Sequence, residues 1–196
     1  VNLIICHIGN GASVTAVQGG KSVDTSMGLT PLEGLVMGTR SGDIDPAVIF
    51  HLARVGGFDI DELDALLNRK SGMLGLTGSA DMREVQAKVD AGDPVAKLAL
   101  DVYCYRLRKY IASYFGVVPN VHAVVFTAGV GENDHVVRAE TITPLAHLGL
   151  DIDPVVNLDR AAGDRVIDTG AGNTRVMVVA TNEELEIALE TLEVLG

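Results

Sequence analysis

The chain opens with short apolar and alternating runs that are typical of β-strands. Residues 2–7 form an apolar run, and residues 13–18 alternate between apolar and polar side chains. Gly19 and Gly20 then provide a hairpin turn into a third run over residues 21–25. This pattern predicts an antiparallel meander of three strands.

The next part of the chain carries helical signals. An Asp-Pro pair at residues 45–46 predicts the start of one helix, and Asp59 or Asp61 caps a second. We expect a short helix over residues 81–91 and a long one over residues 94–115, where apolar side chains recur at helical spacing. The middle of the chain is therefore expected to be mainly helical.

The last third of the chain alternates between strands and helices. Residues 122–127 predict a buried strand, residues 128–133 a glycine-containing loop and residues 134–148 a helix, a unit that suits phosphate binding. A further strand is expected at residues 176–180, followed by a capped terminal helix. The whole pattern predicts an α/β fold whose mixed sheet opens with the antiparallel meander and is flanked by helices.

Composition narrows the function classes. The 196 residues carry a formal net charge of -11, which would repel nucleic acids and anionic lipid surfaces, so we expect no nucleic acid and no membrane as partners. No apolar run approaches the ~20 residues that cross a bilayer. Cys6 and Cys104 stand in apolar runs without metal-ligand spacing, as expected of buried thiols in a reducing compartment. We therefore expect a cytoplasmic protein.

The first segment with candidate chemistry is the turn Gly9-Asn10-Gly11. Its two glycines let backbone N–H groups approach an anion without a Cβ in the way. Asn-Gly is also the favoured dipeptide of a type I′ hairpin turn. The turn alone therefore fits either a phosphate loop or an ordinary hairpin.

The second candidate segment covers residues 129–133, between an apolar strand and a helix whose unsatisfied N–H groups attract negative charge. Asp134 occupies the position at which a dinucleotide fingerprint beginning at Gly129 needs its third glycine. Val14 occupies the same position relative to the turn that begins at Gly9. Residues 20–22 imitate only the end of a P-loop, because Thr15 replaces its leading glycine. The glycine segments therefore suggest an anion site of another type.

Charged residues near these segments have two interpretations each. Arg40 has a glycine two residues away on both sides, so it is either a surface arginine or one that stabilises a transferring phosphoryl group. Asp81 suits a helix cap, whereas capping does not require Arg83. Glu183 opens the terminal helix, where it either complements the helix dipole or contributes to a magnesium site.

Taken together, several segments resemble the acetate kinase family over nearly all of the chain. They are residues 7–13, 26–35, 37–46, 126–133 and 181–185. The resemblance implies a ribonuclease-H-like (actin-like ATPase) domain. It also implies an enzyme that makes acetyl phosphate and ADP from acetate and ATP by direct transfer, with Mg²⁺ or Mn²⁺.

The resemblance implies roles for individual residues. Arg40 would be catalytic at the transition state, Pro31 would contact the acyl group and Glu183 would serve the metal. The nucleotide would be bound by His7, Ile8, Gly9, Asn10, Gly11, Asp81, Met82, Arg83, Gly129, Val130, Gly131, Glu132 and Asn133.

The resemblance covers only about half of the family's chain. It implies that residues 1–196 are the C-terminal nucleotide-binding domain of a two-domain kinase, that the N-terminal domain is absent and that the isolated chain is inactive. It also implies a homodimer formed through this half. Two alternatives stay open: a propionate or butyrate kinase, because one methylene changes affinity by only ~1–3 kcal/mol, and a non-catalytic actin-like nucleotide-binding module, which would not need Arg40.

Overall fold

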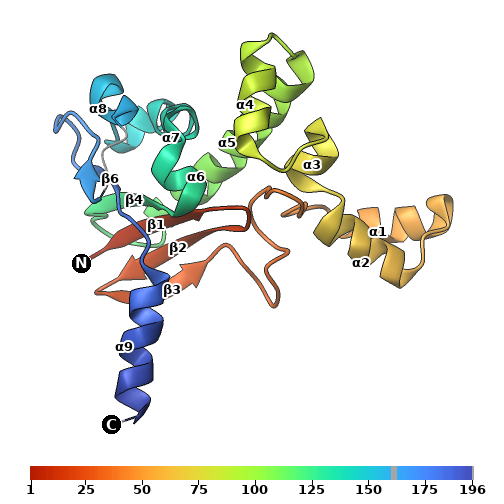
Figure 1. The fold of residues 1–196 in the computed structure, drawn as a ribbon, viewed down its shortest axis with the longest axis horizontal. Coiled ribbons are helices and arrows are strands. Elements are labelled where there is room, and N and C mark those ends of the chain that lie inside the picture. The colour runs from red at the N-terminus through yellow and green to blue at the C-terminus, as the bar shows by residue number, and fades with distance from the viewer. Residues whose placement is uncertain (160–162, 196) are drawn as a thin grey trace.

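The computed structural model describes residues 1–159 and 163–195, except for the side chain of Glu183. Its centre is a six-stranded sheet in the order β3-β2-β1-β4-β6-β5 (Figure 1). The strands are β1 (Leu3–Ile8), β2 (Ala12–Gln18), β3 (Lys21–Thr25), β4 (Ala123–Thr127), β5 (Arg165–Val166) and β6 (Arg175–Val178). The predicted mixed sheet with its opening meander is confirmed.

The directions of the strands determine where a ligand can bind. β1, β2 and β3 pair antiparallel, whereas β4 runs parallel to β1 and β6 runs parallel to β4. β5 adds an antiparallel edge beside β6. Because β1, β4 and β6 are parallel, the segments that follow these three strands leave the sheet at the same edge, which is where ligands bind in open α/β sheets.

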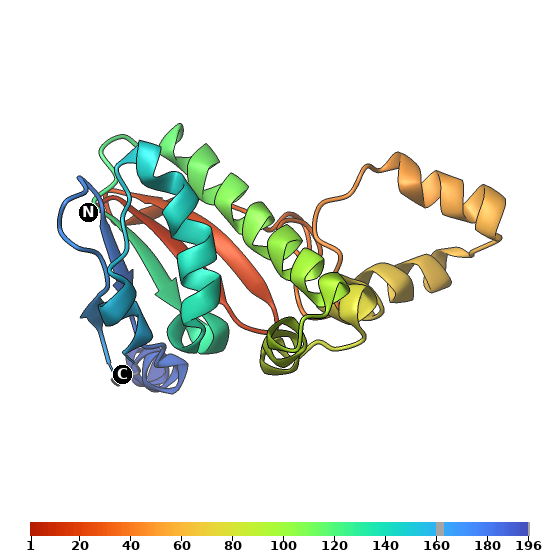
Figure 2. The same ribbon diagram turned by 90° about the horizontal axis from the view of Figure 1, so that it is seen from above.

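Some of the helices cover one face of the sheet, and others project from the body (Figures 1 and 2). The helices are α1 (Ala47–His51), α2 (Ile60–Arg69), α3 (Gly72–Thr77), α4 (Met82–Asp90), α5 (Pro94–Phe115), α6 (Ala128–Asn133), α7 (His135–Ile142), α8 (Pro154–Leu158) and α9 (Glu183–Leu195), with a π-helical turn η1 (Leu52–Gly56) and a 3₁₀ segment η2 (Thr143–Leu148). Figure 2 shows α5 and α7 running across that face. Alternate residues of β1, namely Ile4, Cys6 and Ile8, are fully buried in the core that these helices share.

Some predicted elements differ from those observed. The predicted loop over residues 128–133 is the short helix α6. The predicted helix over residues 134–148 changes to a 3₁₀ segment at Thr143, since Pro144 lacks the N–H that an α-helix needs there. Residues 72–77 form the unpredicted helix α3, and the undefined stretch 151–174 contains α8 and β5.

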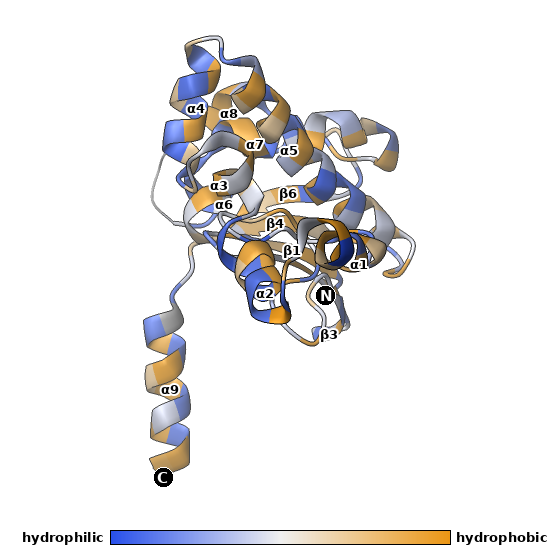
Figure 3. Cartoon of the chain, turned by 90° about the vertical axis from the view of Figure 1, so that its right-hand side faces the viewer, coloured by the Kyte–Doolittle hydropathy of each residue, from blue (hydrophilic) through white to orange (hydrophobic). Residues whose placement is uncertain are grey.

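Two parts project from the body. α1, η1 and α2 form an arm at one end (Figure 2), and neither α1 nor η1 has a buried residue. α9 extends away from the sheet (Figures 1 and 3) and exposes Leu185, Ile187, Leu189, Leu192, Val194 and Leu195. Among the residues that the structure describes, no helix has both the length and the apolar character that a membrane span needs.

Candidate functional site

The predicted anion segments meet at one edge of the sheet. His7 lies opposite Thr127 in the parallel register of β1 and β4, so the turn after β1 and helix α6 after β4 begin side by side. The side chain of Ile8 is fully buried in the core. It therefore offers only its backbone to a ligand.

The turn Gly9-Asn10-Gly11 is not a type I′ hairpin turn. That turn needs positive φ at both central residues, and none of these three residues has a positive φ. A Cβ at position 11 would lie 3.2 Å from Nη1 of Arg40, so glycine at this position leaves room for the guanidinium. The guanidinium of Arg40 thus lies directly over the turn.

The loop that carries Arg40 is fixed by backbone hydrogen bonds. The N–H of Gly38 donates to the carbonyl of Asn10 at 3.0 Å. At the start of α3, the N–H groups of Ser71, Met73 and Leu74 donate to the carbonyls of Thr39, Met37 and Gly38, respectively. The first turn of α3 therefore finds its partners in this loop.

Helix α6 presents one glycine to solvent and packs another against the sheet. Gly129 is exposed, and a Cβ built on it meets nothing within 4 Å. Gly131 is buried, and its Cβ would lie 3.5 Å from the carbonyl carbon of Phe126. The amide of Asn133 donates to the carbonyl of Gly129 at 2.8 Å. Gly129 is thus open to a ligand, whereas Gly131 is buried against the end of β4.

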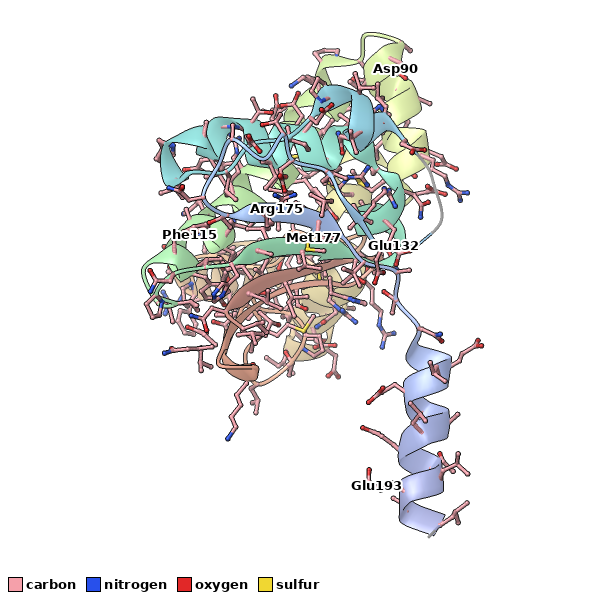
Figure 4. The ribbon with its side chains drawn as sticks, turned by 90° about the vertical axis from the view of Figure 1, so that its left-hand side faces the viewer. Asp90, Phe115, Glu132, Arg175, Met177 and Glu193 are labelled. Atoms are coloured by element: carbon pink, nitrogen blue, oxygen red, sulfur yellow. The ribbon has the colours of Figure 1, made fainter. Side chains whose placement is uncertain are left out.

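A buried arginine holds the end of α6. Arg138 is 1% exposed, and its guanidinium donates to the carbonyls of Gly131 and Glu132 and to both oxygens of Asn157. Burial lowers the pKa of Arg138 to about 10. The carboxylate of Glu132 accepts from the N–H of Thr181 at 3.0 Å, beside the segment that leads to α9 (Figure 4). These contacts tie α6 to its neighbours.

Asp81 and Arg83 are joined at the start of α4. Asp81 is the N-cap and accepts from the N–H of Arg83 at 2.9 Å. The guanidinium of Arg83 also donates to both carboxylate oxygens, at 3.0 and 2.6 Å. These hydrogen bonds lower the pKa of Asp81 to about 2. The exposed Arg83 is held at the rim of the site.

Two adjoining pockets open between these segments. The larger has a volume of about 730 Å³ and is lined by Gly9, Asn10, Asp81, Met82, Arg83, Gln86, Ala87, Asp90, Gly129, Val130, Asn133, Asp134, His135 and Val136. The smaller, about 350 Å³, shares five of these residues and extends to Gly38, Met73, Ala80 and Tyr103. Segments from three distant parts of the chain therefore form one cavity.

Residues 1–189 match the family described as the Acetokinase family. The chain belongs to this family. It is 58% identical over its whole length to the acetate kinase of Streptomyces avermitilis, of which it covers 48%, and 50% identical to that of Campylobacter jejuni subsp. jejuni, of which it covers 50%. The chain thus spans about half the length of the curated relatives it matches.

Solved structures of acetokinases share the fold of this chain. Porphyromonas gingivalis acetate kinase superposes with a TM-score of 0.95 at 41% identity, over 100% of this chain and 49% of that one. A propionate kinase from Francisella tularensis superposes with a TM-score of 0.91 at 46% identity, over 96% of this chain and 48% of that one. This acetokinase chain therefore has the predicted actin-like ATPase fold.

Most of the predicted nucleotide residues of the acetokinase chain line the pockets. Those that do are Gly9, Asn10, Asp81, Met82, Arg83, Gly129, Val130 and Asn133. His7, Ile8, Gly11, Gly131 and Glu132 lie beside or beneath this lining, and Arg40 covers the turn. Pro31 lies on an exposed part of its loop and lines neither pocket.

Sequence reasoning missed part of the pocket wall. Gln86 and Asp90 follow Met82 at intervals of four residues, so one face of α4 continues the wall that Met82 begins. His135, on the first turn of α7, also lines the pocket. The helical stripe on α4 was the available signal.

The predicted metal residue stands at the first position of α9. No group of three or more His, Cys, Asp or Glu residues in the described part of the chain could hold a metal ion. The predicted metal residue Glu183 has a side chain outside the described residues. Thr181, two residues earlier, accepts a hydrogen bond from the N–H of Ala128 at 3.1 Å. The start of α9 is therefore attached to the edge of the sheet where the site lies.

Proposed function

We propose that this chain supplies the nucleotide site of an enzyme that transfers the terminal phosphoryl group of ATP to acetate, giving acetyl phosphate and ADP reversibly. The observation that carries the proposal is the guanidinium of Arg40 over the Gly9–Gly11 turn, at the edge of a 730 Å³ cavity. A nucleotide in that cavity would direct its terminal phosphate toward the turn and Arg40.

Different residues of the site would bind different parts of the nucleotide. Backbone N–H groups of the glycine turn bind phosphate oxygens. Met82, Arg83 and the open face of Gly129 hold the nucleoside. The guanidinium of Arg40 stabilises negative charge on the phosphoryl group in the transition state, where such contacts raise kcat.

Magnesium fits this scheme as a partner of the phosphates. Mg²⁺ binds through one or two carboxylates together with phosphate oxygens and water, so it needs no cluster of protein ligands. We assign Glu183 to it because the start of α9 is attached to α6 through Thr181. When bound, Mg²⁺ or Mn²⁺ neutralises charge on the nucleotide phosphates.

The chain needs a second part to act on acetate. We propose that it is the C-terminal domain of a two-domain, cytoplasmic and homodimeric kinase, and that the absent N-terminal domain completes the active site. The exposed apolar side chains of α9 support a missing partner, since stretches of this kind normally lie against protein. Propionate is the alternative substrate, because a propionate kinase is 46% identical to this chain.

The test uses a joined enzyme, in which this chain replaces the matching half of Streptomyces avermitilis acetate kinase. The acyl phosphate formed from acetate, propionate or butyrate at saturating ATP is trapped as its hydroxamate. We expect Arg40→Ala to lower kcat by ~10³-fold with little change in the KM for ATP, and Arg40→Lys to fall between.

The matched control is Arg54→Ala, which removes an exposed arginine from the arm. Near-normal kcat in Arg40→Ala would refute the catalytic role. Nucleotide binding without any acyl phosphate would favour the non-catalytic module.

A further inference from the structure

Asp43 closes the loop that carries Arg40. Its N–H donates to the carbonyl of Gly34 at 3.0 Å, and its carboxylate oxygen Oδ1 accepts from the N–H of Gly34 at 2.7 Å. Residues 34–43 are therefore joined at their base by two hydrogen bonds to one residue. Gly34 has a φ of 108°, and its Cβ would lie 2.4 Å from the carbonyl oxygen of Ser26, so this base is also tightly packed.

The same carboxylate attaches the loop to the core helix. Its second oxygen, Oδ2, forms an ion pair with Arg106 and accepts from the hydroxyl of Tyr110 at 2.7 Å. Arg106 and Tyr110 are four residues apart on α5, so they present their polar groups on one face of that helix. The side chains of Asp43 and Arg106 are 32% and 20% exposed, which limits screening of the pair by solvent.

Arg40 depends on its backbone for its position. Among the described residues, the contact recorded for its guanidinium is a long one of 3.7 Å to the sulfur of Met37, a weak acceptor. No carboxylate in the described chain is paired with it, which leaves its donors available for a phosphoryl group. Any movement of the loop is therefore transmitted to the guanidinium.

We propose that Asp43, Arg106 and Tyr110 are positioning residues that hold Arg40 for phosphoryl transfer, an inference that rests on the proposed function. They touch neither the pockets nor the glycine turn, and they act through the loop. A misplacement of about 1 Å at a reacting centre can cost ~10²-fold in rate. The anchor should therefore affect kcat more than it affects the KM for ATP.

The first experiment measures the anchor directly by hydrogen exchange. We expect Tyr110→Phe and Asp43→Asn to speed amide exchange in peptides covering residues 34–43 by about tenfold, because a hydrogen bond to a charged group is lost. Tyr105→Phe on the exposed side of α5 and Asp101→Asn, which breaks the Lys97 pair on that helix, are the matched controls. Unchanged exchange in this loop would overturn the proposal.

The second experiment separates positioning from general stability. In the joined enzyme, we expect Tyr110→Phe to lower kcat by about tenfold with the KM for ATP nearly unchanged. In the Arg40→Ala background the same substitution should change kcat by less than about twofold, because there is no guanidinium left to position. An equal loss in both backgrounds would show that Tyr110 acts independently of Arg40 and would overturn the inference.

The failures of the two proposals differ. A joined enzyme that makes no acyl phosphate before any substitution would refute the proposed function and, with it, the positioning role. A kcat that falls on substitution of Arg40 but is unchanged on substitution of Tyr110 or Asp43 would refute the positioning role alone.

Discussion

Replacing Gly11 with alanine separates the stability of the turn from its function. Gly11 does not have a positive φ, so alanine fits its backbone without strain. The new Cβ would lie 3.2 Å from Nη1 of Arg40, a distance at which the neighbour must yield by a few tenths of an ångström. The end of an arginine side chain can yield, whereas the turn backbone stays in place.

The two effects have opposite signs. Alanine restricts the unfolded chain, so we expect the free energy of unfolding to rise by about 0.5 kcal/mol or to stay unchanged. In the joined enzyme, we expect kcat to fall by about tenfold for Gly11→Ala and by ~10²-fold for Gly11→Val, whose branched side chain needs more room. Urea unfolding of the chain and hydroxamate assays of the joined enzyme measure the two quantities.

Two results would contradict this reasoning about Gly11. A loss of stability above about 1 kcal/mol in the alanine variant would mean that the backbone does require glycine. A kcat equal to that of the unsubstituted enzyme would mean that the guanidinium does not lie over the turn during catalysis.

Three further predictions concern support of the site. Gly72→Ala should destabilise the chain by about 3 kcal/mol in urea unfolding, because residue 72 has a φ of 60° and its Cβ would lie 2.2 Å from the carbonyl oxygen of Met37; a neutral result would contradict the close packing. Arg138→Met should cost about 3 kcal/mol, because the carbonyl of Gly131 and both oxygens of the buried Asn157 lose the guanidinium as donor; a stabilised variant would mean that burying the charge is more unfavourable than its hydrogen bonds are favourable. Asp81 has a pKa of about 2 in the folded chain, below its usual 3.8, so its contribution to the free energy of unfolding is present above pH ~4 and is lost as the pH falls toward 2. Asp81→Asn should therefore weaken the dependence of the unfolding free energy on pH in this range. An unchanged pH dependence would exclude this contribution of Asp81.

Much of the fold follows from local patterns. The meander, the capped α5 and the strand before α6 carried period-two or helical signals with turn and capping residues. The missed helix α3 has only six residues, and its first N–H groups bond to the loop of Arg40, far away in sequence. Such a helix depends on tertiary contacts that local propensity does not contain.

The candidate site was predictable in its parts but not in its assembly. Glycine spacing indicated the two anion segments, and the family resemblance assigned them to one nucleotide. The reason for Gly11 could not be read from sequence, since the obstacle is the side chain of Arg40, 29 positions later in the chain. The pairing of Asp43 with Arg106 likewise joins residues 63 positions apart.

The arm formed by α1, η1 and α2 is closed at its base. The N–H of Ser41 donates to the carbonyl of Leu67, and the hydroxyl of Thr39 donates to the carbonyl of Asn68, both at 3.0 Å. These hydrogen bonds hold the two ends of the arm together, so residues can be inserted into the arm without moving Arg40. Gly57, exposed at the tip with a φ of 71°, is therefore a natural position for an inserted reporter or affinity tag.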